Sequence, residues 1–589
     1  MQQNHLTATM EIKLRPRLMD CLKGYDRETF MKDLMAGIIV GIVALPLAIA
    51  FGIASGVTPE KGIVTAIVAG FIISLLGGTK VQIGGPTGAF IVIIYGIVNN
   101  PQYGLQGLLI ATMLAGIILI ALGVFRMGAV IKFIPYPIII GFTAGIAVTI
   151  FTTQMGDVLG LTQEAVTEAG EIVRVPLKTP GDFIGKWVCY AQNIQSFNLW
   201  NFAVAIVGIV VILLSPRLLR SVPVLNKIPG SLWCILVGTG GVLLLKHYGI
   251  TGIDTIGDRF HIQSQLPPMQ VPSITFEMVQ TLMPVAFTIA ILGAIESLLS
   301  ATVADGAISD RHDSNMELVA QGVANLVTPI FGGIPATGAI ARTMTNINNG
   351  GRTPVAGLIH AIVLLLILLL LMPYAEYIPM ASLAAVLVIV SYNMSGWRAF
   401  RGLLRNPKSD VTVLLVTFLL TVIFDLTIAI ELGLVIACAL FIKRVMETTE
   451  ISVIKDEIDP SDEADMHLQD KSLVIPQGCA VYEINGPYFF GIANKFDDLQ
   501  TNLVHGKKPR VQIIRMRKVP FIDSTGIHNL LNLIQMNHDD GIHVILSGVT
   551  PKVNSQLEKA GFYQKMNPDH ICPHIDVALE RARSILSKE

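Results

Sequence analysis

Two stretches of the chain combine paired glycines, a proline and a Thr-Gly-Ala triplet, and these residue types could bind an anion. The first is Gly-Gly-Pro-Thr-Gly-Ala-Phe at residues 84–90, and the second is Gly-Gly-Ile-Pro-Ala-Thr-Gly-Ala-Ile at residues 332–340. Irregular backbone within a membrane is tolerated only where it is buried in protein or lines a cavity. Glycine and proline are common in membrane helices, but matching interruptions in the two halves of a chain are typical of inverted-repeat transporters. We therefore favour a functional interpretation of the pair.

The chemistry predicted at these stretches is anion binding by the backbone. Two half-helices that begin near the middle of the membrane would direct their N-termini at a shared cavity. Unpaired N–H groups and positive dipole ends attract anions without a fixed positive side chain. The residues at the two tips are small, which would let a substrate reach the backbone: Gly88, Ala89, Gly338 and Ala339.

An acidic residue, Glu296, lies within an otherwise apolar segment. A carboxylate there costs about 2.5–3.5 kcal/mol on insertion scales, so it needs a partner, a cavity or a proton. Ser300 lies one helical turn further on and shares its face, and Arg342, beyond the second tip, is the expected ion-pair partner. A static ion pair between two helices is the alternative. We favour proton coupling, because an anion bound at Arg342 would weaken the pair and favour protonation of Glu296.

The elements that would position these residues are membrane helices. The 589-residue chain is 52% hydrophobic and only 14% charged, whereas soluble domains carry roughly 25% charged residues. We predict fourteen membrane segments, of which the third and tenth are short and follow the two Gly/Pro stretches. Their approximate positions are 34–54, 62–78, 86–98, 105–124, 129–153, 199–216, 230–247, 282–304, 316–331, 337–348, 354–372, 380–395, 410–424 and 427–444.

The distribution of basic residues predicts the orientation. Residues 1–33 are polar and basic, and the apolar run after them is too long for a signal peptide. With this N-terminal segment in the cytoplasm, most loop lysines and arginines also fall on the cytoplasmic side. The transmembrane region would then extend over residues 34–446, with both termini cytoplasmic. Asp157, His360, Asp425 and Glu431 are expected near the ends of membrane segments.

The C-terminal part is predicted to be a soluble α/β domain. A linker over 447–469 would join the membrane region to this domain at 470–589. Apolar strand runs occur at 473–475, 479–484, 511–516 and 542–547, and amphipathic helical stretches at 493–505, 525–537, 551–560 and 574–587. Asp523 or Ser524 would cap the helix that follows residue 522. No companion base accompanies this loop, so a capped turn is the simple interpretation and binding or regulation the alternative.

Several classes of function are excluded or disfavoured. A formal net charge of −1 offers no basic surface for nucleic acid. The six cysteines are scattered without metal-ligand or redox spacing, so we expect no metal site, no cofactor and no disulfide framework. Nothing in the sequence indicates an enzyme.

The motifs together resemble the sulfate permease (SulP) family of anion transporters with a C-terminal STAS domain. The resemblance extends over residues 30–586. It rests on the two tips, on Ala-Leu-Pro-Leu-Ala at 44–48, on Leu-Gly-Ala-Ile-Glu-Ser-Leu-Leu at 292–299, on Asn-Asn-Gly-Gly-Arg-Thr at 348–353 and on Asp-Ser-Thr-Gly at 523–526. It implies an inverted repeat of seven plus seven spans, with a core (spans 1–4 and 8–11) and a gate (spans 5–7 and 12–14). It also implies transport by an elevator motion, in a homodimer.

The resemblance also implies roles for particular residues. The substrate-binding positions that it implies are Thr87, Gly88, Ala339, Ile340, Ala341 and Arg342, and the coupling positions are Glu296 and Ser300. The small tip residues Ala89 and Gly338 complete the predicted binding set. The bacterial sodium–bicarbonate members usually have Asp in place of Glu296 and lack Arg342, which favours protons as the coupling ion here. The stretches 293–299 and 391–395 are most similar to the bacterial dicarboxylate-type branch. In stand-alone STAS proteins the serine after the aspartate is phosphorylated, which makes Asp523 and Ser524 regulatory candidates.

The leading hypothesis is a proton-coupled secondary transporter of sulfate or a similar anion, multi-pass in the inner (plasma) membrane and surrounded by lipid. C4-dicarboxylate and bicarbonate are alternative substrates of the same fold. A membrane-tethered signalling protein, whose STAS domain binds a cytoplasmic partner, is the alternative from a different class, and a passive anion channel is a third. The matched half-helices and Glu296 argue against a simple anchor, and a titratable group facing the site argues for coupled movement.

Overall fold

The structure is a computed structural model that describes most of the membrane region and most of the C-terminal domain. The described residues are 14–131, 135–166, 172–180, 182–219, 221, 228–250, 252–260, 264–423, scattered positions between 432 and 446, 450–454, 457–458, 473–489 and 509–588. The predicted helix at 493–505, Asp425, Glu431, and most of the linker and of the span at 427–444 lie outside them. The chain forms two compact units, residues 1–435 and 436–589.

The first unit consists of helices, as predicted. Within the described residues, eight helical segments are long and apolar enough to cross a membrane, so the total of fourteen stays a prediction. They are α2 (Arg27–Ala54), α3 (Pro59–Leu76), α5 (Gly104–Val124), α7 (Tyr136–Leu159), α9 (Leu199–Leu218), α10 (Gly230–His247), α12 (Phe276–Ile308) and Met380–Leu403, which comprises α17 (Met380–Met394) and α18 (Trp397–Leu403). Helix α2 begins earlier than predicted because the Asp26 side chain caps it, accepting a hydrogen bond from the Thr29 N–H at 2.8 Å.

Three shorter helices also belong to the bundle of the first unit. They are α13 (Ser314–Val327), α15 (Val355–Leu370) and α19 (Lys408–Ile423). Helices α2, α3, α5, α12, α13 and α15 pack on one another, and with the short helices at the two tips we call them the core group. Helices α7, α9, α10, α17 and α19 pack on one another and form the gate group. This division follows the one that the family resemblance implies.

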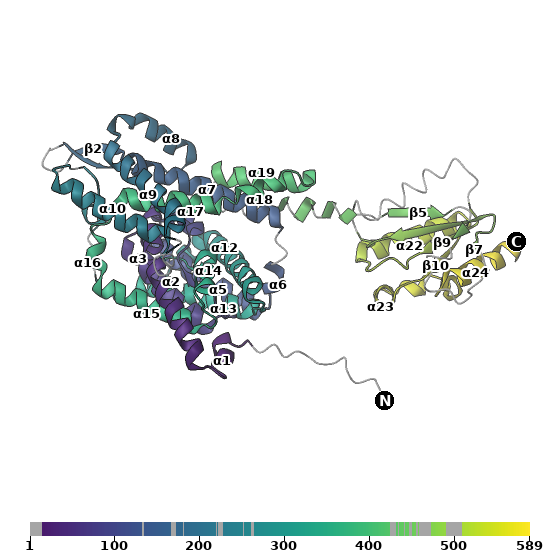
Figure 1. The fold of residues 1–589 in the computed structure, drawn as a ribbon. Coiled ribbons are helices and arrows are strands. Elements are labelled where there is room, and N and C mark those ends of the chain that lie inside the picture. Colours follow the sequence, from purple (N-terminus) through teal and green to yellow (C-terminus); the bar gives the residue numbers. More distant parts are fainter. Residues whose placement is uncertain are drawn as a thin grey trace. The chain divides into compact units, whose positions relative to one another are not determined.

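Glycines permit close helix packing within the core group. Helices α5 and α13 lie side by side in the core group (Figure 1), and their backbones are in close contact at Gly116 and Gly322. A Cβ at Gly116 would lie 2.7 Å from the Gly322 carbonyl oxygen, and a Cβ at Gly322 would lie 2.6 Å from the Gly116 carbonyl oxygen. Any side chain at either position would therefore separate the two helices. Such contacts provide dense packing in membranes, where lipid is as apolar as the protein interior.

The two Gly/Pro stretches meet inside the core group. Strand β1 (Gly84–Gly85) pairs antiparallel with β4 (Thr337–Gly338), with Gly84 opposite Gly338 and Gly85 opposite Thr337. The 3-10 turn η1 (Gly88–Phe90) and helix α4 (Ile91–Val98) follow the first strand, and helix α14 (Ile340–Asn348) follows the second. The prediction of two matching broken segments is confirmed. Their pairing across more than 250 residues brings both tips to one place.

The connection between α7 and α9 contains structure that the sequence did not predict. Strands β2 (Thr162–Val166) and β3 (Ile172–Pro176) form a hairpin, and helix α8 (Phe183–Gln192) follows. Asp182 caps α8 by accepting a hydrogen bond from the Gly185 N–H. The Tyr190 hydroxyl of α8 donates to the Thr152 carbonyl of α7 at 2.9 Å. This helix is therefore attached to the gate group.

The second unit contains the predicted α/β domain, and two strands at 450–454 and 457–458 lie in the segment predicted to be a linker. A five-stranded sheet has the order β11-β10-β9-β8-β5, comprising β11 (Ile571–Cys572), β10 (His543–Ser547), β9 (Val511–Arg515), β8 (Cys479–Asn485) and β5 (Glu450–Ile454). Neighbouring strands are parallel except for the edge strand β5, which runs antiparallel to β8. The helices α22 (Ser524–Asp539), α23 (Pro551–Lys559) and α24 (Ile575–Lys588) agree with three predicted helical stretches. Two further strands, β6 (Glu457–Ile458) and β7 (Leu473–Val474), pair separately.

Candidate functional site

The site begins with the hydrogen bonds that fix the two tips. The Ala339 N–H donates to the Ile83 carbonyl at 2.9 Å, beside the β1–β4 pair. The Thr337 hydroxyl donates to the Gly293 carbonyl of α12 at 2.9 Å. These bonds join both tips to the helix that carries Glu296. The predicted substrate-binding and coupling positions therefore come from three segments held against one another.

Glu296 contacts the first tip directly. The Thr87 hydroxyl donates to Oε2 of Glu296 at 2.8 Å. Thr87 is buried, with 6% of its surface exposed, whereas Glu296 is partly exposed. A proton or an anion that reaches Glu296 would therefore act on the residue just before the start of η1. Sequence reasoning placed both residues at the site but did not predict this hydrogen bond.

Arg342 lies at the junction of the tips, but not as the predicted partner of Glu296. Its guanidinium donates to the Gly84 carbonyl at 3.4 Å and to the Pro86 carbonyl. Within the described part of the chain it forms no ion pair with Glu296, so the expectation of a direct pair is wrong. A Cβ at Gly85 would lie 2.3 Å from Nη1 of Arg342. The backbone of the first tip thus accommodates and satisfies the guanidinium, and Arg342 can act on Glu296 only through its charge.

Gly88 lies against the gate group. A Cβ at this position would lie 2.9 Å from Sδ of Met394 and 3.3 Å from Cδ1 of Ile150, with the Phe51 ring also in contact at 3.5 Å. We call these three side chains the apolar closure. They belong to α17, α7 and α2 respectively. The glycine is therefore required for close contact between the first tip and the gate group, and not only for access to the backbone.

The remaining predicted site residues differ in their surroundings. Ala89, Gly338 and Ala339 are buried, whereas Ile340 and Ala341 at the start of α14 are exposed. A Cβ at Gly338 would overlap the Gln82 side chain. The Ser300 hydroxyl donates to the Thr343 hydroxyl at 3.3 Å, and Thr343 in turn accepts from the Ile83 N–H at 3.1 Å. Ser300 thus supports the tips and forms no described hydrogen bond with Glu296.

A buried acid on α13, Glu317, was missed by sequence reasoning. Its carboxylate accepts hydrogen bonds from the Gly78 N–H and the Thr79 hydroxyl, both at 3.0 Å, from the Ser297 hydroxyl at 3.3 Å and from the Gln321 amide at 2.8 Å. Its side chain is fully buried. The sequence does contain a signal for it, because Glu317 falls within the predicted span at 316–331. Ionisable residues inside membrane spans are rare and usually functional.

We expect the substitution Glu317→Ala to destabilise the membrane unit. Four donors would lose their acceptor, and each unsatisfied buried group costs about 1–3 kcal/mol. A net loss of about 2–4 kcal/mol and a clearly lower melting temperature of the purified protein should follow. Glu317→Gln keeps one acceptor oxygen and should lose less. An unchanged melting temperature for the alanine variant would show that the network contributes nothing to stability.

His360 also differs from expectation. It was predicted near a membrane boundary, but it lies within α15 and is fully buried. Neither ring nitrogen has a hydrogen-bond partner among the described residues. A Cβ at Gly70 would lie 3.3 Å from Nδ1 of His360 and 3.3 Å from the Gly84 carbonyl oxygen. The ring therefore packs behind the first tip, and the prediction of a boundary position is wrong.

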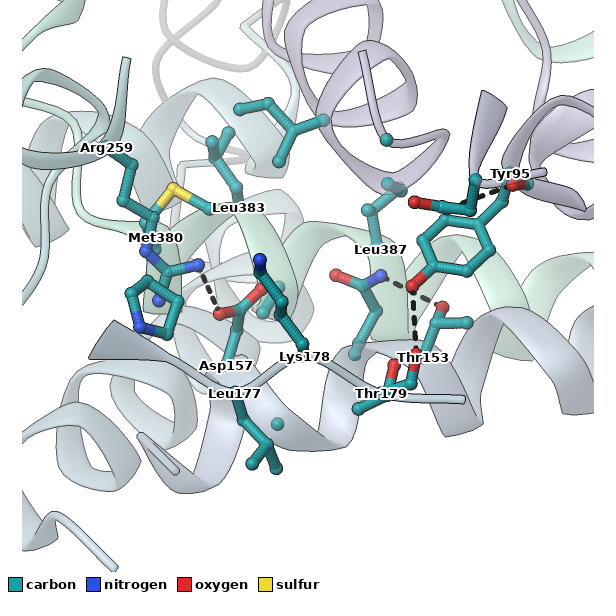
Figure 2. A pocket seen from close by; sticks show the side chains of 18 of the residues that line it. Tyr95, Thr153, Asp157, Leu177, Lys178, Thr179, Arg259, Met380, Leu383 and Leu387 are labelled. Carbon is teal, nitrogen blue, oxygen red and sulfur yellow. Dashed lines mark hydrogen bonds and ion pairs between the residues drawn. The ribbon is translucent and has the colours of Figure 1, made fainter. Parts of the chain in front are cut away.

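A cavity of about 1130 Å³ lies between the core and gate groups (Figure 2). The core side contributes residues from the end of α2, from α4 and from the turn after it, including Ala50, Tyr95 and Asn99. The gate side contributes residues from α7 and α17, and the 176–179 segment and Arg259 also line it. Asp157, at the end of α7 as predicted, pairs with Arg259 at 2.7 Å. None of the described tip residues lines this cavity, so it is separate from the predicted anion site in this conformation.

In the second unit, the regulatory candidates form a helix cap. Asp523 accepts a hydrogen bond from the Gly526 N–H at 2.7 Å and is the N-cap of α22. Ser524 is the first helical residue and is exposed. Its exposure makes it accessible to a modifying enzyme. Across the described parts of both units, no three His, Cys, Asp or Glu side chains are grouped to hold a metal ion.

Two half-helix tips that pair inside a core group, packed beside a gate group, are the architecture of a polytopic membrane transport protein, here followed by an α/β domain. Comparison with known families matches the sulfate permease family over residues 30–417 and the STAS domain over residues 470–578. The chain belongs to the sulfate permease family and carries a STAS domain. The relatives named below are transporters and not enzymes.

Known proteins resemble the chain along most of its length. It is 40% identical over 566 residues to YvdB of Bacillus subtilis, which is named provisionally as a sulfate transporter, and the match covers 94% of this chain and 98% of that one. It is 28% identical over 559 residues to the bicarbonate transporter BicA of Picosynechococcus, covering 93% of this chain and 94% of the relative. The murine anion transporter Slc26a9, solved in an inward-facing state, has the same fold, with a TM-score of 0.82 at 19% identity. That match covers 99% of this chain and 97% of the other.

Proposed function

We propose that the protein is a secondary active transporter of sulfate or a similar anion, and that protons drive it. The observation that supports this best is the meeting of both half-helix tips beside Glu296. Helix N-termini attract anions through their N–H groups and dipoles. The carboxyl next to them, bonded to Thr87 at 2.8 Å, is a group that can take up and release a proton. An anchor for a signalling domain would need neither feature.

Sulfate is the first choice of substrate within this proposal. The relative YvdB is named for sulfate and BicA for bicarbonate, so both anions deserve direct comparison. Because backbone dipoles recognise charge more than shape, C4-dicarboxylate also stays a candidate. The test is uptake of labelled sulfate, bicarbonate and succinate by the purified protein in liposomes, with and without an imposed pH gradient. If none of the three enters faster than into protein-free liposomes, this proposal is wrong.

We propose that transport follows from movement of the core group relative to the gate group. The tips and Glu296 belong to the core group, so the bound anion would travel with it. The lack of a side chain at Gly88 permits the close contact with Met394 and Ile150 that such a movement must break. We further propose a homodimer in the inner membrane with both termini in the cytoplasm. There the STAS domain would bind a partner, or be phosphorylated at Ser524.

We expect the STAS domain to be dispensable for substrate binding and needed for assembly or regulation. The predicted binding residues all lie in the first compact unit, residues 1–435. A chain ending at Lys443 should therefore bind the anion with an affinity within about threefold of the full chain, even if transport slows. Binding is measured on purified protein, with gel filtration as the control for folding. Loss of binding in a folded, truncated protein would show that the STAS domain shapes the site.

The competing functions give different results in the same liposomes. A passive channel would dissipate an anion gradient but would never accumulate the anion in response to protons. A tethered signalling protein would move no anion at all. In that case, substitutions at Asp523 and Ser524 should change the binding of a cytoplasmic partner, and substitutions at Glu296 should not.

A further inference from the structure

A contact between Tyr95 and Thr179 joins two sides of the cavity shown in Figure 2. Tyr95 lies on α4, seven residues after Gly88 at the first tip. Its hydroxyl donates to the Thr179 carbonyl at 3.4 Å, across the cavity. The ammonium of Lys186, on α8, lies 5.3 Å from the centre of the Tyr95 ring. A residue of the core group thus contacts residues 176–180 and 182–192, which we together call the α8 segment.

The α8 segment is attached to the gate group at its other end. The Tyr190 hydroxyl donates to the Thr152 carbonyl of α7 at 2.9 Å. The edge of its ring is close to α7, because a Cβ at Gly156 would lie 3.4 Å from it. Helix α8 also packs on α19. A displacement of α4 along the gate group would therefore separate Tyr95 from Lys186 and Thr179.

The contact with Lys186 is the stronger of the two. Lys186 is only 2% exposed, and a cation over an aromatic face is more favourable when it is shielded from water. The hydrogen bond to Thr179 is long, and contributes less. The separation of Tyr95 from Lys186 would therefore account for most of the cost of the displacement.

We propose that Tyr95 is a positioning residue through which the α8 segment holds the first half-helix against the gate group. The contact stabilises the conformation in which Gly88 lies against the apolar closure of Phe51, Ile150 and Met394 and no described tip residue lines the cavity. Loss of the contact favours conformations in which the cavity reaches the tips. The inference rests on the proposed movement of the core group, but on no particular substrate.

The test measures access to the apolar closure and needs no transported anion. Ile150 is fully buried, so a cysteine at this position reacts only when the closure opens. Ile150→Cys is introduced after the six native cysteines are replaced by serine or alanine. The rate of modification by the neutral reagent N-ethylmaleimide is then measured on the purified full chain in nanodiscs.

We expect Lys186→Met and Tyr95→Leu each to raise the modification rate by about three- to thirtyfold, because the rate follows the population of open molecules. Tyr95→Phe keeps the ring and should raise it by about twofold or less. The modification rate of the double variant, Tyr95→Leu with Lys186→Met, should be close to that of each single variant, because the two residues act through one contact. Lys178→Met is the matched control, because Lys178 lines the same cavity without contacting the Tyr95 ring, and it should leave the rate unchanged.

The proposal is overturned if Lys186→Met and Tyr95→Leu leave the rate unchanged, or if Lys178→Met raises it as much as they do. Increased modification in a protein that moves no anion would support this inference and contradict the proposed function. If the protein transports an anion but Lys186→Met and Tyr95→Leu leave the modification rate unchanged, the proposed function is supported and this inference is contradicted.

Discussion

The substitution Glu296→Gln should abolish accumulation driven by a pH gradient while anion binding and exchange persist. Glutamine has nearly the shape of the protonated glutamate, and its amide oxygen can still accept the hydrogen bond that Thr87 donates at 2.8 Å. The tips should therefore keep their geometry while the proton site is lost. If one proton accompanies each anion, a gradient of one pH unit allows roughly tenfold accumulation, and the variant should show none.

The measurement is concentrative uptake into liposomes at a fixed anion gradient, with and without an inward proton gradient. Substrate and proton should bind cooperatively to the unmodified protein, with a coupling free energy of about 1–3 kcal/mol. Thr87→Ser, which keeps the hydroxyl, is the control for the hydrogen bond and should remain coupled. If the glutamine variant still concentrates substrate in response to the gradient, Glu296 has only a structural role.

The second large effect is expected at Gly88. A leucine there should block transport, because even the first added carbon would lie 2.9 Å from the Met394 sulfur, and overpacking costs about 1–3 kcal/mol or more. We expect at least a tenfold loss of the maximal uptake rate, while the melting temperature of the STAS domain is unchanged. The rate is measured in the same liposomes.

Two further variants show whether the loss of transport comes from the contact with the gate group or from general misfolding. Gly88→Ala should reduce the rate less than leucine does, and Met394→Ala in the same chain should restore part of it by removing the sulfur that the new methyl group meets. Rapid uptake by the Gly88→Leu variant would show that Gly88 does not lie on the transport path. Failure of Met394→Ala to restore any activity to the alanine variant would place the obstruction elsewhere.

The sequence by itself determined those features that depend on local composition and spacing. Membrane segments follow from apolar runs, and the strands and helices of the C-terminal domain from the change between periods of about two and about four residues. The two tips were predictable because their Gly/Pro stretches match each other within the same chain. Asp523 was predictable as a cap, because an aspartate before a helical run satisfies exposed N–H groups. In each case the cause can be found in the composition and order of residues along the chain, without knowledge of tertiary contacts.

Only the tertiary structure decided which partners the functional side chains have. Arg342 was expected to pair with Glu296, but carbonyls at Gly84 and Pro86 satisfy it, more than 250 residues away in the chain. Glu317 finds its donors on two other segments, and His360 is enclosed by packing that its own helix does not reveal. The contact between Tyr95 and Lys186 depends on helix α8, which lies inside the connection between α7 and α9 and was not predicted from the sequence. Buried polar and charged groups form hydrogen bonds with the groups that packing places next to them. Packing at these sites depends on the fold of the whole unit and not on the local sequence.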